Sequence, residues 1–189
     1  EFLDGRELKD LLANKELAAD RALAIAAQVA DGLAYAHQHD VVHRDIKPAN
    51  IMILRDGRVK ITDFGIARMR TADVRTQTGV VLGSPRYLSP EQVLGKRCDA
   101  RADTFSLGVI IYEMVTGQTP FNGIDVNSLM FQIVNFIPPP PTTVNSKLPP
   151  MLDLIIAKAL AKSAEERYAR IAELAADLTQ DTYRKAWES

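Results

Sequence analysis

The chain has 189 residues, of which 47% are hydrophobic and 25% are charged, and its formal net charge at pH 7 is -1. This composition predicts one globular domain or one large subdomain and excludes a disordered tail. Because charges of both signs are interspersed, it also argues against a broad surface for binding nucleic acid or an anionic membrane.

Cysteine usage and the apolar runs bear on location. Cys98 is the single cysteine, so no intrachain disulfide can form, and no cysteines and histidines have the spacing of a zinc site. This usage is typical of a reducing compartment, so we expect a cytoplasmic location. The longest apolar run, residues 104–117, is too short to cross a bilayer and contains Glu113. We therefore expect no membrane contact from this segment, although a longer protein could be anchored elsewhere.

The first half of the chain predicts one helix and one hairpin. Asp20 is expected to cap a helix of about five turns, in which Ile25, Val29 and Leu33 recur at four-residue spacing. Two β-branched runs follow, residues 51–54 and 59–62, and the turn signal between them favours an antiparallel hairpin. The polar stretch after the hairpin has no periodicity and is typical of a loop.

The second half is predicted to be helical. Residues 102–115 are apolar nearly all round, which indicates a buried helix that serves as the hub of a bundle. Prolines 138–141 are expected to end the preceding helix and to run extended. Two amphipathic helices, over residues 152–160 and 171–178, close the chain. The predicted fold class is therefore mainly α, a helical bundle around a buried central helix with one small β-hairpin.

The open end of the hairpin gathers polar groups. If the strands pair as predicted, Asn50 and Asp63 leave them side by side, and their oxygen atoms suit Mg²⁺. Asp45 and Lys47 lie just upstream, so a carboxylate, an ammonium group and a metal site converge. This combination fits phosphoryl transfer. The alternative is that Asp45 and Lys47 form a surface ion pair, and that Asn50 and Asp63 are strand caps.

Several motifs then identify a family. The sequence HRDIKPAN at 43–50, followed by DFG at 63–65, resembles the catalytic and metal-binding signature of protein kinases. The sequence GSPRYLSPEQ at 83–92 resembles the end of their activation segment, and residues 99–121 and 164–168 resemble the helices behind it. The likeness covers essentially the whole chain and is closest to bacterial, eukaryotic-like (Hanks-type) serine/threonine kinases.

The resemblance implies a domain map. Residues 1–189 would form the C-terminal lobe of a protein kinase, with the hinge at 1–5, the catalytic loop at 43–50 and the activation segment at 63–91. The N-terminal lobe, which carries the glycine-rich loop and the β3 lysine, precedes the hinge and is absent from this sequence. We therefore expect the chain alone to be inactive, to bind ATP weakly and to self-associate through the face that an N-terminal lobe would cover.

The resemblance also assigns roles within the signature. Asp45 would be the catalytic base, and Lys47 would contact the transferring phosphoryl group of ATP. Asn50 and Asp63 would bind Mg²⁺. A lysine two residues after the aspartate is the serine/threonine version of the loop, so the implied partners are proteins that present serine or threonine hydroxyls.

The same match places adenine and the structural supports. The carbonyl of Glu1 and the amide of Leu3 would bind the base, with Met52 in the floor beneath it. Two supports are implied: an ion pair that braces the activation segment, and a carboxylate that holds the catalytic-loop backbone. They are assigned to Glu91 with Arg167 and to Asp103, respectively.

The histidines have structural interpretations. His43 belongs to the signature, and its implied role is packing under the DFG turn rather than acid-base catalysis. His37 and His39 stand at a predicted helix end and are interpreted as capping or solvated groups.

The activation segment contains the departures from the family pattern and a predicted switch. Ser84 and Ser89 stand where these kinases usually have threonine and alanine. Thr76 and Thr78 are predicted to be autophosphorylated, with Arg44 and Arg68 receiving one phosphate.

Two classes of function remain open. The first is an enzyme, a serine/threonine kinase lobe that uses ATP and Mg²⁺. The alternative is a non-catalytic scaffold or a pseudokinase-type binding module. The retained residues Asp45, Lys47, Asn50 and Asp63 favour the enzyme, because a protein without this chemistry has no physical need for them.

Overall fold

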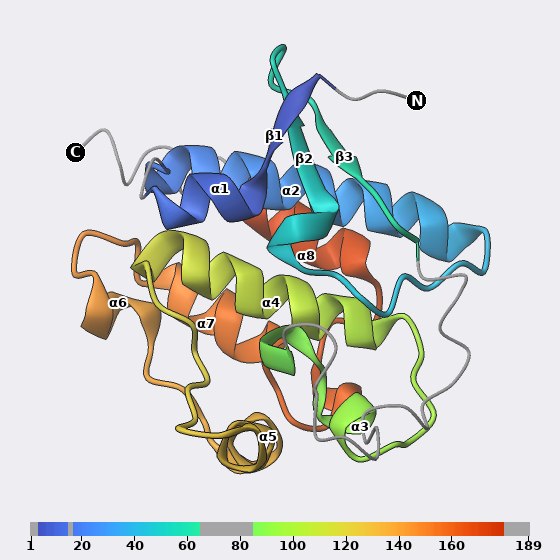
Figure 1. Ribbon diagram of the computed structural model, residues 1–189, viewed down its shortest axis with the longest axis vertical. Helices are drawn as coiled ribbons and strands as arrows, with labels where there is room; N and C mark the ends of the chain where they lie inside the picture. The colour runs from blue at the N-terminus through green and yellow to red at the C-terminus, as the bar shows by residue number, and fades with distance from the viewer. Residues whose placement is uncertain (1–3, 15–16, 65–84, 180–189) are drawn as a thin grey trace.

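The structure, a computed structural model, describes residues 4–14, 17–64 and 85–179. Over these ranges the chain is mainly helical, with a small sheet at one end of a helical bundle, as the sequence predicts (Figure 1). Glu1, Leu3 and most of the predicted activation segment lie outside the described residues. No helix in the described ranges combines the length and apolar character needed to span a lipid bilayer.

The sheet has three antiparallel strands in the order β1-β2-β3, with bounds Gly5–Glu7, Ile51–Leu54 and Val59–Ile61. The predicted hairpin is confirmed as β2 and β3. Strand β1 was not predicted, because three residues carry no periodic signal of their own. Gly5 permits the pairing, since a Cβ at that position would lie 2.5 Å from the carbonyl oxygen of Ile53.

The first helices cross the bundle beneath the sheet. Helix α1 spans Leu8–Ala13, and the predicted long helix is confirmed as α2, Ala19–Gln38. Its N-cap is Ala18, and no side chain caps it, so the capping role expected of Asp20 is wrong. Asp20 lies in the first turn instead, where its charge still favours the positive end of the helix dipole.

Helix α4, Arg101–Thr116, is the predicted hub and is buried along nearly its whole length. It packs against α2, against α7 (Met151–Ala159) and against α8 (Ile171–Thr179), and it runs through the middle of the bundle in Figure 1. Gly117 ends it with a φ of 72°, a left-handed conformation typical of helix C-termini. The two predicted closing helices are confirmed as α7 and α8.

Short elements complete the fold. The prediction for the proline run is only partly right, because Pro141 begins a helix rather than continuing the extended segment; proline suits the first turn, where no N–H donor is needed. The remaining elements are η1 (Pro48–Asn50), η2 (Pro85–Tyr87), α3 (Pro90–Val93), α5 (Val126–Asn135), α6 (Pro141–Val144) and η3 (Ala164–Glu166).

Candidate active site

A buried carboxylate organises the loop between α2 and β2. Asp103, in the first turn of α4, is fully buried and accepts hydrogen bonds from the backbone N–H groups of His43 at 2.9 Å and of Arg44 at 2.7 Å. Its Oδ2 also lies 2.8 Å from Nε2 of His37. Arg44 has a φ of 65°, in the left-handed region that non-glycine residues rarely adopt. Asp103 therefore holds an unfavourable backbone conformation in place, as predicted for this residue.

The side chains of the loop converge on Asp45. Nζ of Lys47 donates to Oδ2 of Asp45 at 2.7 Å, and Nδ2 of Asn50 donates to the Asp45 carbonyl at 2.9 Å. The Asp45 and Lys47 side chains keep 28% and 23% of their surface exposed, so a ligand can reach both. The structure thus brings together three of the predicted site residues around one partly exposed carboxylate.

Asp63 follows β3 at the same end of the sheet. The N–H of Thr62 donates to the carbonyl of Asn50 at 2.9 Å, so the next residue, Asp63, leaves the sheet beside the loop that carries Asp45. Asp63 is exposed and has a φ of 55°. Because the donor end of the Asn50 amide faces Asp45, its oxygen is the end that can face a cation. Two hard oxygen donors fit Mg²⁺, which usually completes its shell with water and substrate phosphates.

Histidine predictions have mixed outcomes. His43 is fully buried, its ring lies 4.8 Å from that of Phe64, and it accepts at Nδ1 from the Asp45 N–H, which confirms a core histidine. His39 lies 2.8 Å from the Tyr35 carbonyl at the end of α2, in agreement with capping. The interpretation of His37 as a capping or solvated group is wrong, because it bonds the buried Asp103. Its partner is distant in sequence and left no local signal.

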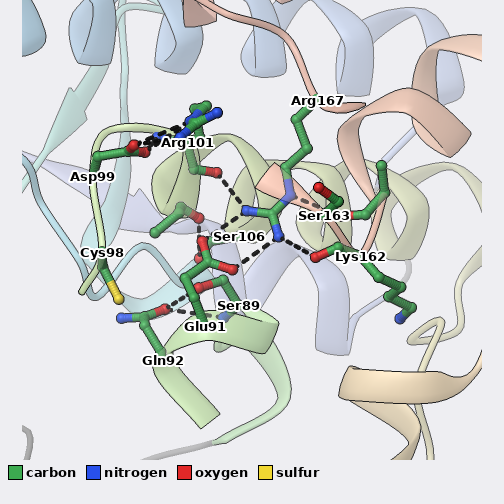
Figure 2. A network of polar contacts seen from close by, with 12 residues as sticks. Ser89, Glu91, Gln92, Cys98, Asp99, Arg101, Ser106, Lys162, Ser163 and Arg167 are labelled. Atoms are coloured by element: carbon green, nitrogen blue, oxygen red, sulfur yellow. Dashed lines mark hydrogen bonds and ion pairs between the residues drawn. The ribbon is translucent and has the colours of Figure 1, made fainter. Parts of the chain in front are cut away.

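The predicted ion pair between Glu91 and Arg167 is present. The guanidinium nitrogens lie 2.7 and 2.9 Å from the two carboxylate oxygens, and they also donate to nearby backbone carbonyls (Figure 2). Burial alone would raise the pKa of the Glu91 carboxyl, but hydrogen bonds from Arg167 and a backbone N–H, together with the Arg167 charge, lower it. The pair fixes α3 to the segment that follows α7.

A second anchor was not predicted. Tyr87 donates its hydroxyl proton to Glu113 at 2.8 Å, and the Ser106 hydroxyl donates to the Tyr87 carbonyl at 2.7 Å. Burial raises the pKa of both Tyr87 and Glu113. The signal in the sequence was a glutamate inside an otherwise apolar helix. These bonds attach η2, which precedes α3, to the hub.

The adenine-binding predictions remain untested. Glu1 and Leu3 lie outside the described residues. Met52 is half-buried in β2, opposite Lys60 of β3 and Glu7 of β1, and nothing in this arrangement tests a contact with a base.

Known proteins resemble the chain over nearly its whole length. A family model described as the protein kinase domain matches residues 1–183. The serine/threonine-protein kinase PknB of Mycolicibacterium smegmatis is 44% identical over 181 residues, which are 94% of this chain and 29% of that protein. PknB of Mycobacterium tuberculosis is 42% identical over 183 residues, 95% of this chain and 29% of that protein.

A third relative differs in length. PknL of Mycobacterium tuberculosis, also a serine/threonine-protein kinase, is 41% identical over 179 residues, which are 94% of this chain and 45% of that protein. The chain therefore spans less than half the length of each of these relatives.

Proposed function

This chain belongs to the protein kinase family, and we propose that it forms the large lobe of a serine/threonine kinase. Its relatives are bacterial kinases of the Hanks type. In a complete catalytic domain, the lobe would transfer the γ-phosphoryl group of ATP to serine or threonine hydroxyls of proteins. For the whole protein, we propose as substrates and partners the class of proteins that present serine or threonine hydroxyls.

One observation carries the proposal: the convergence of Lys47 and Asn50 on Asp45. The Asp45 carboxylate is partly exposed and lies 2.7 Å from the Lys47 ammonium group. A carboxylate so placed can orient a substrate hydroxyl and accept its proton, while the adjacent ammonium group neutralises phosphoryl oxygens. A surface ion pair alone would not require a buried aspartate beneath the loop.

Asn50 and Asp63 would hold Mg²⁺ through the Asn50 amide oxygen and the Asp63 carboxylate. When bound, the ion would neutralise charge on the phosphate oxygens of ATP. The contribution of the chain itself is to hold Asn50 just before β2 and Asp63 just after β3, at neighbouring strand ends. Glu1, Leu3 and Met52 are proposed to bind adenine.

We further propose that residues 1–189 alone do not transfer phosphate efficiently. This sequence contains no glycine-rich phosphate loop, and phosphoryl transfer depends strongly on positioning the phosphates. Self-association through the face around Met52 belongs to the same proposal. The phosphorylation of Thr76 and Thr78 stays a prediction, since both lie outside the described residues.

The experiment is a transfer assay with the full-length protein. Labelled ATP, Mg²⁺ and a generic basic protein are supplied, and the labelled amino acid is identified after hydrolysis. We expect label on serine or threonine. Label on tyrosine would overturn the substrate class, and absence of any Mg²⁺-dependent transfer would favour the scaffold or pseudokinase alternative.

A further inference from the structure

Gln92 joins helix α3 to the candidate catalytic loop. Its Nε2 donates to the backbone carbonyl of Arg44 at 2.7 Å. Its Oε1 accepts from the Ser89 backbone N–H at 2.9 Å and from the Ser89 hydroxyl at 3.1 Å. Figure 2 shows Gln92 and Ser89 beside the Glu91 carboxylate at the start of α3. One half-buried amide thus bridges two segments that are far apart in the sequence.

The chemistry of the neighbours fixes the orientation of this amide. A backbone N–H can only donate, so the Gln92 oxygen must face Ser89, and the NH₂ group is left to face the Arg44 carbonyl, which can only accept. Ser89 is fully buried, and its hydroxyl adds a second donor to the same oxygen. The serine that departs from the family pattern therefore helps to direct the Gln92 donor toward the loop.

The carbonyl that Gln92 binds belongs to the peptide group leading into Asp45. The N–H of that peptide group donates to Nδ1 of His43 at 3.2 Å, so the group is held at both its oxygen and its nitrogen. The preceding peptide group is held at the Arg44 N–H by Asp103. Because Arg44 is in the left-handed region, these bonds oppose its relaxation toward a more common conformation. A rotation here would turn the Asp45 carboxylate away from Lys47.

We propose that Gln92 is a positioning residue for Asp45, an inference that rests on the proposed kinase function. Its donor holds the peptide plane from which the Asp45 side chain projects. The same contact couples α3, where the predicted activation segment ends, to the candidate base. This role differs from that of the Glu91 and Arg167 pair, which attaches α3 to the segment after α7 and does not touch the loop.

The competing explanation is helix capping alone, and a single substitution separates the two. Capping uses only the Gln92 oxygen, whereas positioning uses its NH₂ group. Gln92→Glu keeps an oxygen for the Ser89 N–H but has no proton to donate to Arg44 at neutral pH. Gln92→Met, which removes both functions at similar length, is the second variant if the first does not fold.

Gln132 supplies a matched control. Its amide also brackets backbone groups, accepting from the Asn122 N–H at 3.0 Å and donating to the Asn122 carbonyl, but it lies on α5 and does not contact the loop. Gln132→Glu therefore imposes the same chemical loss at an amide that bonds Asn122 instead of the loop.

The experiment measures kcat and KM in the full-length protein and amide hydrogen exchange at Arg44 and Asp45. Gln92→Glu is expected to lower kcat by about ten- to a hundredfold, with KM for ATP within about twofold of wild type, and to speed exchange at both amides. Gln132→Glu should leave all three quantities near wild type. If the wild type is active and Gln92→Glu has the same kcat as the wild type, the inference is overturned.

Failure of the kinase proposal is distinguishable from failure of this inference. If the wild type transfers no phosphate, the proposed function is wrong, and the exchange measurement on the chain still decides whether Gln92 holds the loop. Faster exchange in Gln92→Glu than in Gln132→Glu would support the positioning contact, whereas equal exchange would overturn it.

Discussion

Oδ1 of Asp103 lies 2.7 Å from the backbone nitrogen of Arg44, so a buried side chain of the hub helix directly supports a loop residue in the left-handed region. The other carboxylate oxygen accepts from the His43 N–H and lies 2.8 Å from Nε2 of His37. The candidate base, Asp45, directly follows Arg44 in the chain. The site is therefore supported from beneath by the buried hub helix α4.

Asp103→Asn should lower both stability and transfer. The amide keeps the shape but replaces one acceptor oxygen with a donor that faces another donor, which costs about 1–3 kcal/mol of unfolding free energy. We expect kcat to fall at least about tenfold, because the loop loses a backbone anchor. The control is Asp153→Asn, since Asp153 accepts from the Thr142 N–H and hydroxyl away from the loop. Equal kcat in the two variants would contradict the anchoring role.

Arg167→Met should destabilise the fold strongly. Glu91 would keep a partly buried carboxylate without its guanidinium partner, and breaking such a pair typically costs about 3–5 kcal/mol. Arg101→Met provides the comparison, because Arg101 pairs with an Asp99 side chain that is 57% exposed, and exposed pairs contribute at most about 1 kcal/mol. Urea unfolding measures both. Similar losses in the two variants would show that the Glu91 pair has no special importance.

Lys162 should increase the free energy of unfolding as the pH rises into the alkaline range. Its Nζ donates to the Ile133 carbonyl at 2.7 Å, and burial, with a smaller contribution from the Arg167 charge, lowers its pKa from 10.5 to about 8. Between about pH 8 and about pH 10.5 the unfolded chain thus binds more protons at this group than the folded chain, so deprotonation favours folding.

The check compares the wild type with Lys162→Met. The difference in unfolding free energy, wild type minus variant, should become more favourable to the wild type as the pH rises through about 8. A constant or falling difference would show that the folded-state pKa of Lys162 is not depressed.

Local patterns predicted much of the fold. The hairpin of β2 and β3, the long helix α2, the hub α4 and the closing helices α7 and α8 each carry a periodic signal within their own residues. Strand β1 carries none, because it exists only through pairing with β2. The start of α2 was misplaced because Asp20, a capping residue type, lies two positions after the N-cap Ala18, and in sequence it looks the same there as at the helix boundary.

The candidate site was predicted in two steps: the polar groups at the open end of the hairpin indicated phosphoryl transfer, and the motif resemblance then assigned a role to each residue. Asp45, Lys47 and Asn50 are close in sequence, so their convergence could be inferred from one loop. The contacts of His37 and Gln92 could not, since their partners Asp103 and Arg44 lie 66 and 48 positions away. Local sequence carries no signal for such distant partners; the Glu91 and Arg167 pair, 76 positions apart, was predicted only through the family resemblance.

Asp63→Asn should weaken Mg²⁺ use while leaving the fold intact. Asparagine tolerates the left-handed φ of 55° at this position, so the substitution changes the charge and not the backbone. We expect the Mg²⁺ concentration for half-maximal transfer to rise about tenfold or more. Asp56→Asn, in the exposed hairpin turn, is the control. An unchanged Mg²⁺ requirement in Asp63→Asn would rule out Asp63 as a metal ligand.

The phosphotransfer proposal is tested most directly by the single-turnover transfer rate of full-length Asp45→Asn at saturating ATP and Mg²⁺. Asp40→Asn is the matched control, since Asp40 is exposed, lies at the start of the same loop and also has a positive φ of 57°. The account predicts a fall of about 10²- to 10⁴-fold for Asp45→Asn, with ATP binding retained, and no fall for Asp40→Asn. A transfer rate for Asp45→Asn within a few-fold of wild type would contradict the account.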